Sequence, residues 1–290
     1  MKALSKEYVR LGELRGLVDD ALQALLPDPG DPPHRLHAAM RYALLSPGKR
    51  IRPVLALLCA QHLGAPLATA LPGACALEFV HAASLVLDDL PCMDDAPMRR
   101  GQPSVHVRYG EDIAVLTGVA LLNEAYAIVS RAHGVPEATR VQMTSLIAST
   151  VGTSGLVGGQ ESDLRGDAEA TLGYLSQVHH QKTGVLFVAS VEMGGLAAGA
   201  DVPTLAHLRR FAVELGLAFQ ALDDLDDADE IAAGARPVAS LLTVMGPDGV
   251  LTEARNRLTA AKKALRDCGA RMTPMCDYVD LLVGGVESRA

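Results

Sequence analysis

Apolar residues recur at helical spacing along nearly the whole chain. The stretch 73–87 is rich in Ala, Leu and Val with few polar breaks, which indicates a buried helix, and the other stretches are similar. The segments with this pattern are residues 54–63, 73–87, 113–132, 174–197, 204–227 and 251–267. No alternating run of β-branched residues with a hairpin turn is found in the sequence, so no strand is predicted.

Clusters of proline and glycine separate the helical segments. They occupy residues 27–33, 134–136 and 246–249, and each cluster predicts a loop. Pro53 suits the first turn of the helix that continues over 54–63. No linker, short repeat or shift in composition divides the chain. We therefore predict one all-α domain over residues 1–290, a large helical bundle whose core holds a cavity.

Composition and charge narrow the class of protein. The 290 residues are 49% hydrophobic, which is enough for a substantial core. Lys and Arg total 26 against 34 Asp and Glu, and this acidic balance argues against a nucleic-acid or anionic-membrane partner. The five scattered cysteines form no CxxC pair, so a reducing compartment is expected. Without a secretory signal or a long apolar run, we expect a cytoplasmic protein with no membrane span.

Two clusters of acidic residues each follow an apolar helical segment. The first is DDLPCMDD (88–95), where Pro91 should end the helix and let Asp94 return toward Asp88. The second is DDLDDADE (223–230), where Asp223 and Asp227 stand four residues apart and share one helix face.

An acidic run is usually a solvated helix face, but the position of these two clusters favours another interpretation. Carboxylates stacked at the C-terminal end of an apolar helix repel one another and oppose the helix dipole. Divalent cations would neutralise them. Oxygen ligands without His or Cys favour Mg²⁺, which commonly binds one or two carboxylates together with substrate phosphates.

Basic residues beside apolar helices supply candidate phosphate ligands. An isolated basic doublet most often lies on a solvated surface, but three sets near two acidic clusters favour phosphate binding. These sets are Lys49-Arg50 with Arg52, Arg99-Arg100, and Lys182 with Thr183. His81 lies two helical turns before Asp88 on about the same face, and a role as an ordinary core histidine stays open. His179 and His180 receive no role.

These motifs together resemble the trans-isoprenyl diphosphate synthases, the polyprenyl synthetase family, and come closest in pattern to bacterial geranylgeranyl diphosphate synthases of the carotenoid type. The matching segments are GKRIRP (48–53), residues 81–106, GLVGGQESDL (155–164), KTG (182–184) and FQALDDLDD (219–227). They follow the family's order, and the DDxxxxD…RRG combination is the most specific signal. The resemblance implies an all-α fold of the isoprenoid synthase type with a central substrate cavity, usually in a homodimer.

The resemblance also implies the reaction and the residues that perform it. A Mg²⁺-dependent prenyltransferase would condense isopentenyl diphosphate with an allylic diphosphate. The implied catalytic residues are Asp88, Asp89, Asp94, Lys182, Asp223 and Asp224, and the implied Mg²⁺ ligands are Asp88, Asp94, Asp223 and Asp227. Isopentenyl diphosphate would bind Lys49, Arg52, His81 and Arg100, and the allylic substrate would bind Arg99, Lys182, Thr183 and Gln220.

One segment departs from the family pattern. The family follows its second acidic motif with lysines that reach the allylic diphosphate, whereas ADEIAAGARPVASLLTVMG (228–246) contains none. Arg236 is the only basic residue between Arg210 and Arg255. We interpret Arg236 either as a partial substitute for the missing lysines or as part of a looser loop. We expect this departure to affect how the allylic pocket closes more than which class of reaction the protein catalyses.

Product length should depend on what blocks the cavity below the first acidic motif. Ala83 lies about 7.5 Å down the helix from Asp88, and both Ala83 and Ser84 are small enough for a growing tail to pass. Phe79 lies about 13.5 Å from Asp88 and is a candidate floor, although it is equally well an ordinary core residue. We predict a C20 product, geranylgeranyl diphosphate. A C15 product is the alternative, because a facing residue such as Tyr126 could close the cavity.

Three other classes of protein share some of these sequence features. A class I terpene cyclase needs aromatic faces to guide cations, and this chain has no Trp, four Phe and six Tyr. A weakly active synthase-like partner subunit is disfavoured by two intact aspartate motifs, although the lysine-free segment keeps it open. A structural helical protein does not predict the ordered basic sets.

Overall fold

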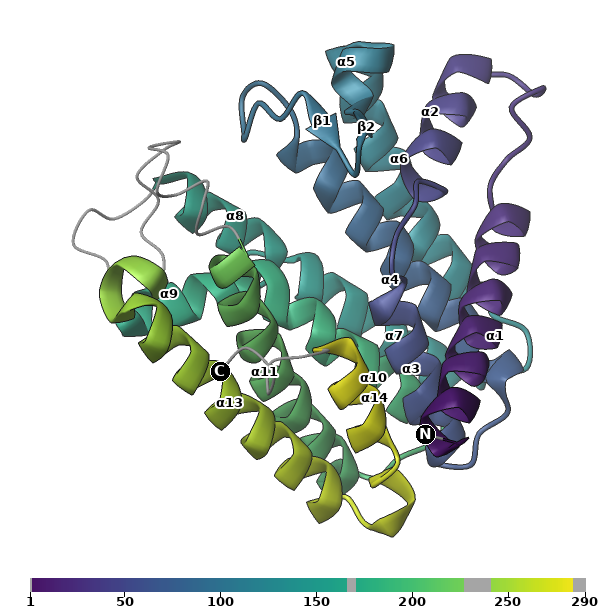
Figure 1. Cartoon of the computed structure of the whole chain (residues 1–290). Helices are drawn as coiled ribbons and strands as arrows, with labels where there is room; N and C mark the ends of the chain where they lie inside the picture. The colour runs from purple at the N-terminus through teal and green to yellow at the C-terminus, as the bar shows by residue number, and fades with distance from the viewer. Residues whose placement is uncertain (1, 166–170, 227–240, 284–290) are drawn as a thin grey trace. The chain divides into compact units, whose positions relative to one another are not determined.

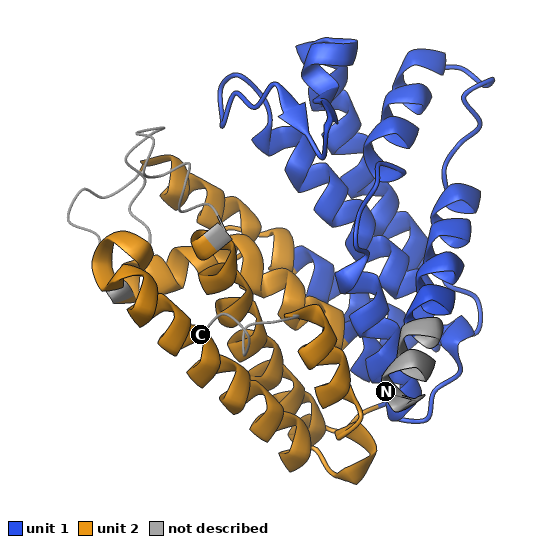
Figure 2. Ribbon diagram, in the orientation of Figure 1, with its two compact units in different colours: residues 1–148, 193–199 blue, residues 149–192, 200–290 orange. Residues whose placement is uncertain are grey.

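The computed structural model describes residues 2–165, 171–226 and 241–283. Nearly all of the described secondary structure is helical, which confirms the predicted all-α class (Figure 1). The chain forms two compact units, which are coloured separately in Figure 2. Unit 1 comprises residues 1–148 and 193–199, and unit 2 comprises residues 149–192 and 200–290. That residues 1–290 form a single domain stays a prediction, and each unit is described by itself.

Unit 1 is built around helices α3 and α4, which pack against each other. Its elements are α1 (Lys2–Leu25), α2 (His34–Leu44), α3 (Ile51–His62), α4 (Leu67–Asp88), β1 (Met98–Arg99), β2 (Gln102–Pro103), α5 (Val105–Tyr109), α6 (Glu111–Ser130) and most of α7 (Glu137–Val151). Helix α4 also packs along α6, and α1 contacts both α3 and α4. Leu55, Leu57, Leu77 and Phe79 are fully buried, so the core of unit 1 lies along α3 and α4.

Helices α4 and α6 are unusually apolar. By length and composition alone, each of them could cross a membrane. In α4, however, 72% of the apolar window is buried in the protein, as in a core helix. The corresponding share in α6 is 39%, and Val115, Leu116 and Val119 lie exposed on it. The absence of a membrane span stays a prediction.

Unit 2 is built around the long pair α11 and α13. Its elements are α8 (Leu156–Arg165), α9 (Leu172–His179), η1 (His180–Gly184), the first part of α10 (Val185–Ala197), α11 (Val202–Asp226), α13 (Leu241–Asp267), η2 (Ala270–Met272) and α14 (Met275–Leu282). Helix α11 packs most extensively against α13, and η1 lies against both α8 and α11. Phe187 and Phe211 are buried in its core.

Two local predictions, the absence of strands and the loop at 246–249, were wrong, each for a physical reason. A short antiparallel hairpin, β1–β2, forms where no strand was predicted, because a two-residue strand is too short to show alternation. The predicted helix 174–197 is confirmed as the contiguous α9, η1 and α10, with residues 180–184 in the π-helical form. The predicted loop at 246–249 is instead a kink inside α13, where Gly246 takes φ 68° and Pro247 resumes the helix.

Candidate functional site

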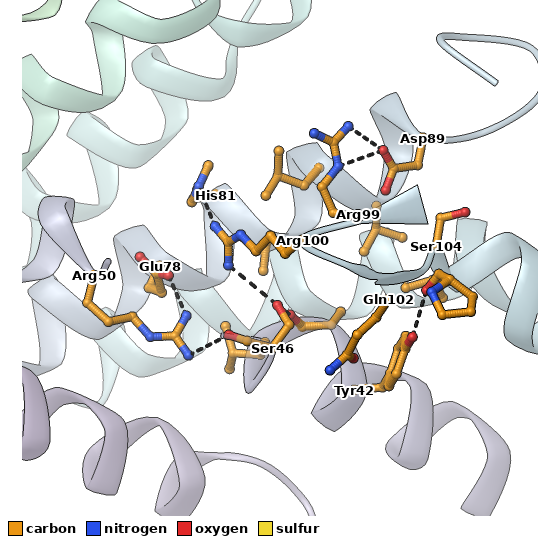
Figure 3. A pocket seen from close by; sticks show the side chains of 17 residues that line it. Tyr42, Ser46, Arg50, Glu78, His81, Asp89, Arg99, Arg100, Gln102 and Ser104 are labelled. Carbon is orange, nitrogen blue, oxygen red and sulfur yellow. Dashed lines mark hydrogen bonds and ion pairs between the residues drawn. The ribbon is translucent and has the colours of Figure 1, made fainter. Parts of the chain in front are cut away.

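A pocket in unit 1 brings His81 together with three arginines of the predicted basic sets, Arg50, Arg99 and Arg100 (Figure 3). It is lined by the end of α2, the last three turns of α4 and the β1–β2 hairpin. The charged residues and the histidine that line it are Arg50, Glu78, His81, Asp89, Arg99 and Arg100. Segments that lie up to about fifty residues apart in sequence therefore place cations around one pocket, as a phosphate site requires.

The hairpin explains the RRG sequence in structural terms. Arg99 pairs with Gln102 across the hairpin, which leaves Arg100 and Gly101 as the two-residue loop. Both loop residues have positive φ, 53° at Arg100 and 77° at Gly101, as in the type I′ turns that join tightly twisted strands. Glycine adopts this conformation freely, whereas Arg100 pays a steric penalty of the kind that collects at functional sites.

His81 accepts hydrogen bonds from two arginines of the predicted substrate set. Its Nε2 lies 3.3 Å from Nη1 of Arg52 and 3.3 Å from Nη2 of Arg100. Because a guanidinium can only donate, Nε2 is the unprotonated nitrogen of a neutral ring. Burial, with the charges of Arg52 and Arg100, holds the pKa of His81 well below its ordinary value. The three side chains thus form a basic fork in which only the arginines carry charge.

Two other members of the basic set are placed differently. Lys49 is exposed, one residue before the buried Arg50. The guanidinium of Arg50 donates to Glu78 over 2.7 Å and to Asp19 over 2.8 Å, so it is bound by carboxylates of the protein. The Cβ of a residue replacing Gly48 would lie 2.8 Å from Nη1 of Arg100, so glycine at 48 lets the hairpin approach this turn.

The first acidic cluster forms a tight turn at the end of α4. The helix ends at Asp88, and the backbone N–H of Asp94 donates to the Asp88 carbonyl over 2.9 Å. This is the return that Pro91 predicted. Asp88 and Asp94 are half-buried. The buried carboxylate of Asp89 accepts hydrogen bonds from Nε of Arg99, over 2.9 Å, and from Nη2 of the same residue.

The donor set at this turn fits Mg²⁺ bound together with phosphate. Among the described residues, no group of three or more His, Cys, Asp or Glu side chains could enclose a metal ion. Mg²⁺ does not need such a cage, since it commonly binds one or two carboxylates and completes its octahedron with water and substrate phosphate oxygens. Asp88 and Asp94 supply two carboxylates on one turn, and carboxylate oxygens are the hard ligands that Mg²⁺ prefers.

In unit 2, Lys182 lies in the π-helix and forms an ion pair. Its Nζ lies 2.5 Å from Oδ2 of Asp163 on α8. π-Helical turns often occur at functional sites, because the extra residue shifts side chains out of regular register. His179 lies nearby, and burial, with the charge of Lys182, lowers its pKa against the opposing effect of Asp224 and Asp163. Lys182 therefore sits in a partly buried cluster of charges.

A chain of hydrogen bonds links the π-helix to the second acidic cluster. Thr183 Oγ1 donates to Gln220 over 3.1 Å, and the Gln220 amide donates to Oδ1 of Asp224 over 3.1 Å. The other Asp224 oxygen accepts from the backbone N–H of Leu241, the first residue of α13. Asp224 is buried among these donors, whereas Asp223 is half-buried. Asp227 and Arg236 lie outside the described residues.

The residues predicted to set product length all lie on α4. Phe79 and Ala83 are buried, and the Ser84 hydroxyl donates to the His81 carbonyl over 2.9 Å. The pocket in unit 1 is lined on this helix by Ala82, Leu85 and Val86, and Ala83 is absent from its lining. The roles of Ala83, Ser84 and Phe79 in chain length therefore stay predictions.

Sequence reasoning missed the carboxylates that pair with the basic residues. Glu78 lies in an apolar stretch of α4, and only its charge in that stretch could have signalled a buried partner. Asp163 belongs to the GGQESD segment that matched the family pattern, but it received no role. Asp19 lies on an amphipathic helix where acidic residues are common, so it gave no signal.

The chain matches known proteins over most of its length. The profile of the polyprenyl synthetase family matches residues 33–233. Geranylgeranyl diphosphate synthase from Pantoea ananas is 39% identical over 277 residues, which is 91% of this chain and 91% of that protein. The geranylgeranyl diphosphate synthase of Pseudescherichia vulneris is 39% identical over 259 residues, 87% of this chain and 84% of that protein.

Two solved structures also match the chain over nearly its whole length. An FPP/GFPP synthase from Zymomonas mobilis matches with a TM-score of 0.88 at 30% identity, over 97% of this chain and 100% of that chain. A geranyltransferase from Legionella pneumophila matches with a TM-score of 0.90 at 28% identity, over 99% of this chain and 100% of that chain. The fold is thus the all-α isoprenoid synthase fold that the motifs predicted.

Proposed function

The chain belongs to the polyprenyl synthetase family, and we propose that it condenses isopentenyl diphosphate head-to-tail with an allylic diphosphate to give geranylgeranyl diphosphate. It is a trans-prenyltransferase of isoprenoid biosynthesis. The observation that carries the proposed reaction is the basic fork of His81, Arg52 and Arg100. A terpene cyclase binds a single diphosphate and has no use for this second anion site.

In the proposed reaction the C1–O bond of the allylic substrate breaks, and its electron pair leaves with the diphosphate. The double bond of isopentenyl diphosphate attacks the resulting allylic cation, and a proton is then lost to the released pyrophosphate. Mg²⁺, when bound, neutralises the charge that develops on the leaving diphosphate. We assign its ligands to Asp88 and Asp94 in unit 1 and to Asp223 and Asp227 in unit 2.

The basic residues position the two substrates in this scheme. We assign Lys49, Arg52, His81 and Arg100 to isopentenyl diphosphate, which holds its double bond beside the reacting carbon. We assign Arg99, Lys182, Thr183 and Gln220 to the allylic substrate. The hydrogen bond between Thr183 and Gln220 supports a shared role, because it fixes two polar groups of α11 and η1 beside each other.

Asp89 and Asp224 would act in this scheme through their neighbours. The carboxylate of Asp89 orients the Arg99 guanidinium, and that of Asp224 orients the Gln220 amide. Both were predicted as catalytic residues. Their hydrogen bonds to protein groups favour positioning roles, each within its own unit.

A C20 product is favoured over C15 for two reasons. The curated relatives that cover most of this chain are named geranylgeranyl diphosphate synthases. Ala83 and Ser84 leave room for a long tail below the first acidic motif. The Zymomonas mobilis structure, described as an FPP/GFPP synthase, keeps C15 as the alternative.

We also propose a cytoplasmic homodimer. The exposed apolar residues Val115, Leu116 and Val119 on α6 support self-association, because a second copy of this surface would remove them from water. Sedimentation of the wild type and of Val119→Asp tests this assignment. A dimer that Val119→Asp converts to monomer is expected, and a monomeric wild type would contradict it.

A product assay on the purified protein tests the proposed function. Mg²⁺ and labelled isopentenyl diphosphate are supplied with dimethylallyl, geranyl or farnesyl diphosphate in turn, and the dephosphorylated products are sized. C20 products are expected. C15 products would support the same condensation reaction, with the residue that blocks the cavity closer to the first acidic motif. Folded protein that elongates none of the three primers would favour the partner-subunit alternative.

A further inference from the structure

Arg50 is a buried cation in the turn that carries Lys49 and Arg52. Its side chain is 4% exposed. Nη1 donates to Glu78 over 2.7 Å, Nε donates to Asp19 over 2.8 Å, and Nη2 donates to the Ser46 carbonyl over 3.2 Å. The guanidinium is thus satisfied by three protein acceptors from three different segments, as Figure 3 shows for Glu78 and Ser46.

The backbone of Arg50 adopts a conformation that arginine does not favour. Its φ and ψ are 51° and 34°, in the left-handed region, at the residue that precedes α3. Glycine adopts this conformation without steric cost, but a residue with a Cβ keeps it only where the surrounding structure holds it there. The ion pairs of Arg50 are the interactions that hold this turn.

The Arg50–Glu78 ion pair connects the turn before α3 to the basic fork. Glu78 precedes His81 by three residues on α4, so the two side chains lie on one face of that helix. Arg52 follows Arg50 by two residues and donates to His81 over 3.3 Å. Ser46 links the third arginine, because its carbonyl accepts from Arg50 and its hydroxyl accepts from Arg100 over 3.4 Å.

Charge balance supports the same arrangement. Arg50, Arg99 and Arg100 all line the pocket in unit 1, and Glu78 is a buried carboxylate among them. Burial, with the charges of Arg50 and Arg99, lowers the pKa of Arg100, and Glu78 opposes this effect. Without Glu78, the cations would repel one another before any anionic substrate had bound.

We propose that Arg50 and Glu78 are a positioning pair for the isopentenyl diphosphate site, which sets the geometry of Arg52, His81 and Arg100 without touching the substrate. The proposal rests on the proposed function. Loss of the pair should weaken binding of isopentenyl diphosphate while the chemical step and the allylic site remain largely intact.

Steady-state kinetics of four variants test the pair. Arg50→Lys keeps the charge but lacks the planar fork that reaches two carboxylates, and Glu78→Gln leaves Arg50 buried without its main counterion. Each is expected to raise the KM for isopentenyl diphosphate by about tenfold while kcat changes less than about threefold. The KM for the allylic substrate should change less than about twofold.

Two further variants separate positioning from stability. The double variant R50M/E78M replaces a buried ion pair by apolar residues of similar length, which often restores stability. Its urea midpoint should recover toward that of the wild type, while the KM for isopentenyl diphosphate remains raised. Glu192→Gln disrupts another pair with a buried carboxylate, to Arg209 in unit 2, and should lower stability without raising that KM.

Two outcomes would overturn the proposal. One is a wild-type KM for isopentenyl diphosphate in R50M/E78M, and the other is an equal rise of both substrate KM values in Arg50→Lys and Glu78→Gln. If the wild type itself makes no product, the proposed function fails, and calorimetric titration with isopentenyl diphosphate and inorganic pyrophosphate still tests the pair. If the wild type and the variants bound isopentenyl diphosphate with equal affinity in that titration, the proposal would also be overturned.

Discussion

The backbone N–H of Leu241 donates to Oδ2 of Asp224 over 3.0 Å, which ties the first residue of α13 to the end of α11. The other Asp224 oxygen accepts from the Gln220 amide, so both oxygens of this carboxylate are engaged by the protein. Asp223, the adjacent residue of the same acidic motif, is half-buried, and its carboxylate is a proposed Mg²⁺ ligand. Two neighbouring aspartates should therefore respond differently to substitution.

Asp224→Ala is expected to lower the free energy of unfolding by about 1–3 kcal/mol, because it leaves the buried N–H of Leu241 and the half-buried amide of Gln220 without their acceptor. Asp223→Ala is expected to change stability by less than about 1 kcal/mol and to lower kcat about a hundredfold or more, with a higher Mg²⁺ requirement. Urea denaturation and Mg²⁺-dependent turnover measure these effects. Equal stability losses in the two variants would contradict this assignment.

Stability should decline in mild acid because His81 is held neutral in the fold. Its pKa lies well below the ordinary value of 6.5 in the folded protein, so the unfolded chain binds more protons as the pH falls below 6.5. The free energy of unfolding is then constant above that pH and falls below it, by at most about 1.4 kcal/mol per pH unit from this group.

His81→Gln provides the matched comparison, since its amide oxygen can still accept from Arg52 and Arg100 but does not titrate. Urea denaturation of both proteins between about pH 5.5 and about pH 8 should give a smaller acid loss in the variant. His179 and His180, whose pKa values burial also lowers, should leave part of the loss in place. An unchanged acid loss would show that His81 is not the group responsible.

Product length provides a direct test of the α4 residues. Ala83→Phe is expected to shift the product from C20 to C15, because a ring at this buried position would block a growing tail. Phe79→Leu, a smaller side chain one turn deeper, should allow a fraction of longer products. Sizing of the dephosphorylated products, with urea denaturation alongside, separates a blocked cavity from an overpacked core. C20 product from a stable Ala83→Phe enzyme would rule out Ala83 as the gate.

A glycine contact within unit 1 gives a prediction about packing. A Cβ on Gly194 would lie 2.3 Å from the carbonyl oxygen of Ala56, so the backbones of α10 and α3 approach too closely for any side chain. Gly194→Ala should therefore cost about 1–3 kcal/mol of stability. Gly12 and Gly16 on α1 have open space at Cβ, and their replacement by Ala should stabilise the protein by about 0.5–1 kcal/mol. Thermal unfolding compares the three variants.

Much of the fold could be predicted from local pattern. The apolar period along 54–63, 113–132 and 251–267 predicted helices that the structure contains as α3, α6 and α13. The prediction failed where the apolar pattern outweighed a single helix-breaking residue. Pro72 was expected before the helix beginning at residue 73, yet α4 runs through it from Leu67, because burial of the apolar α4 outweighs one lost hydrogen bond.

The candidate site could be predicted only as a set of residue types. The sequence by itself determined the reaction class through its resemblance to the polyprenyl synthetase family, which rests on two aspartate motifs and three basic sets in the family's order. Only the tertiary structure decided which charge pairs with which: Arg50 with Glu78, Arg99 with Asp89, and Lys182 with Asp163. The physical reason is that a motif fixes the spacing of side chains along the backbone, whereas ion pairing depends on distances between segments that meet only when the chain folds.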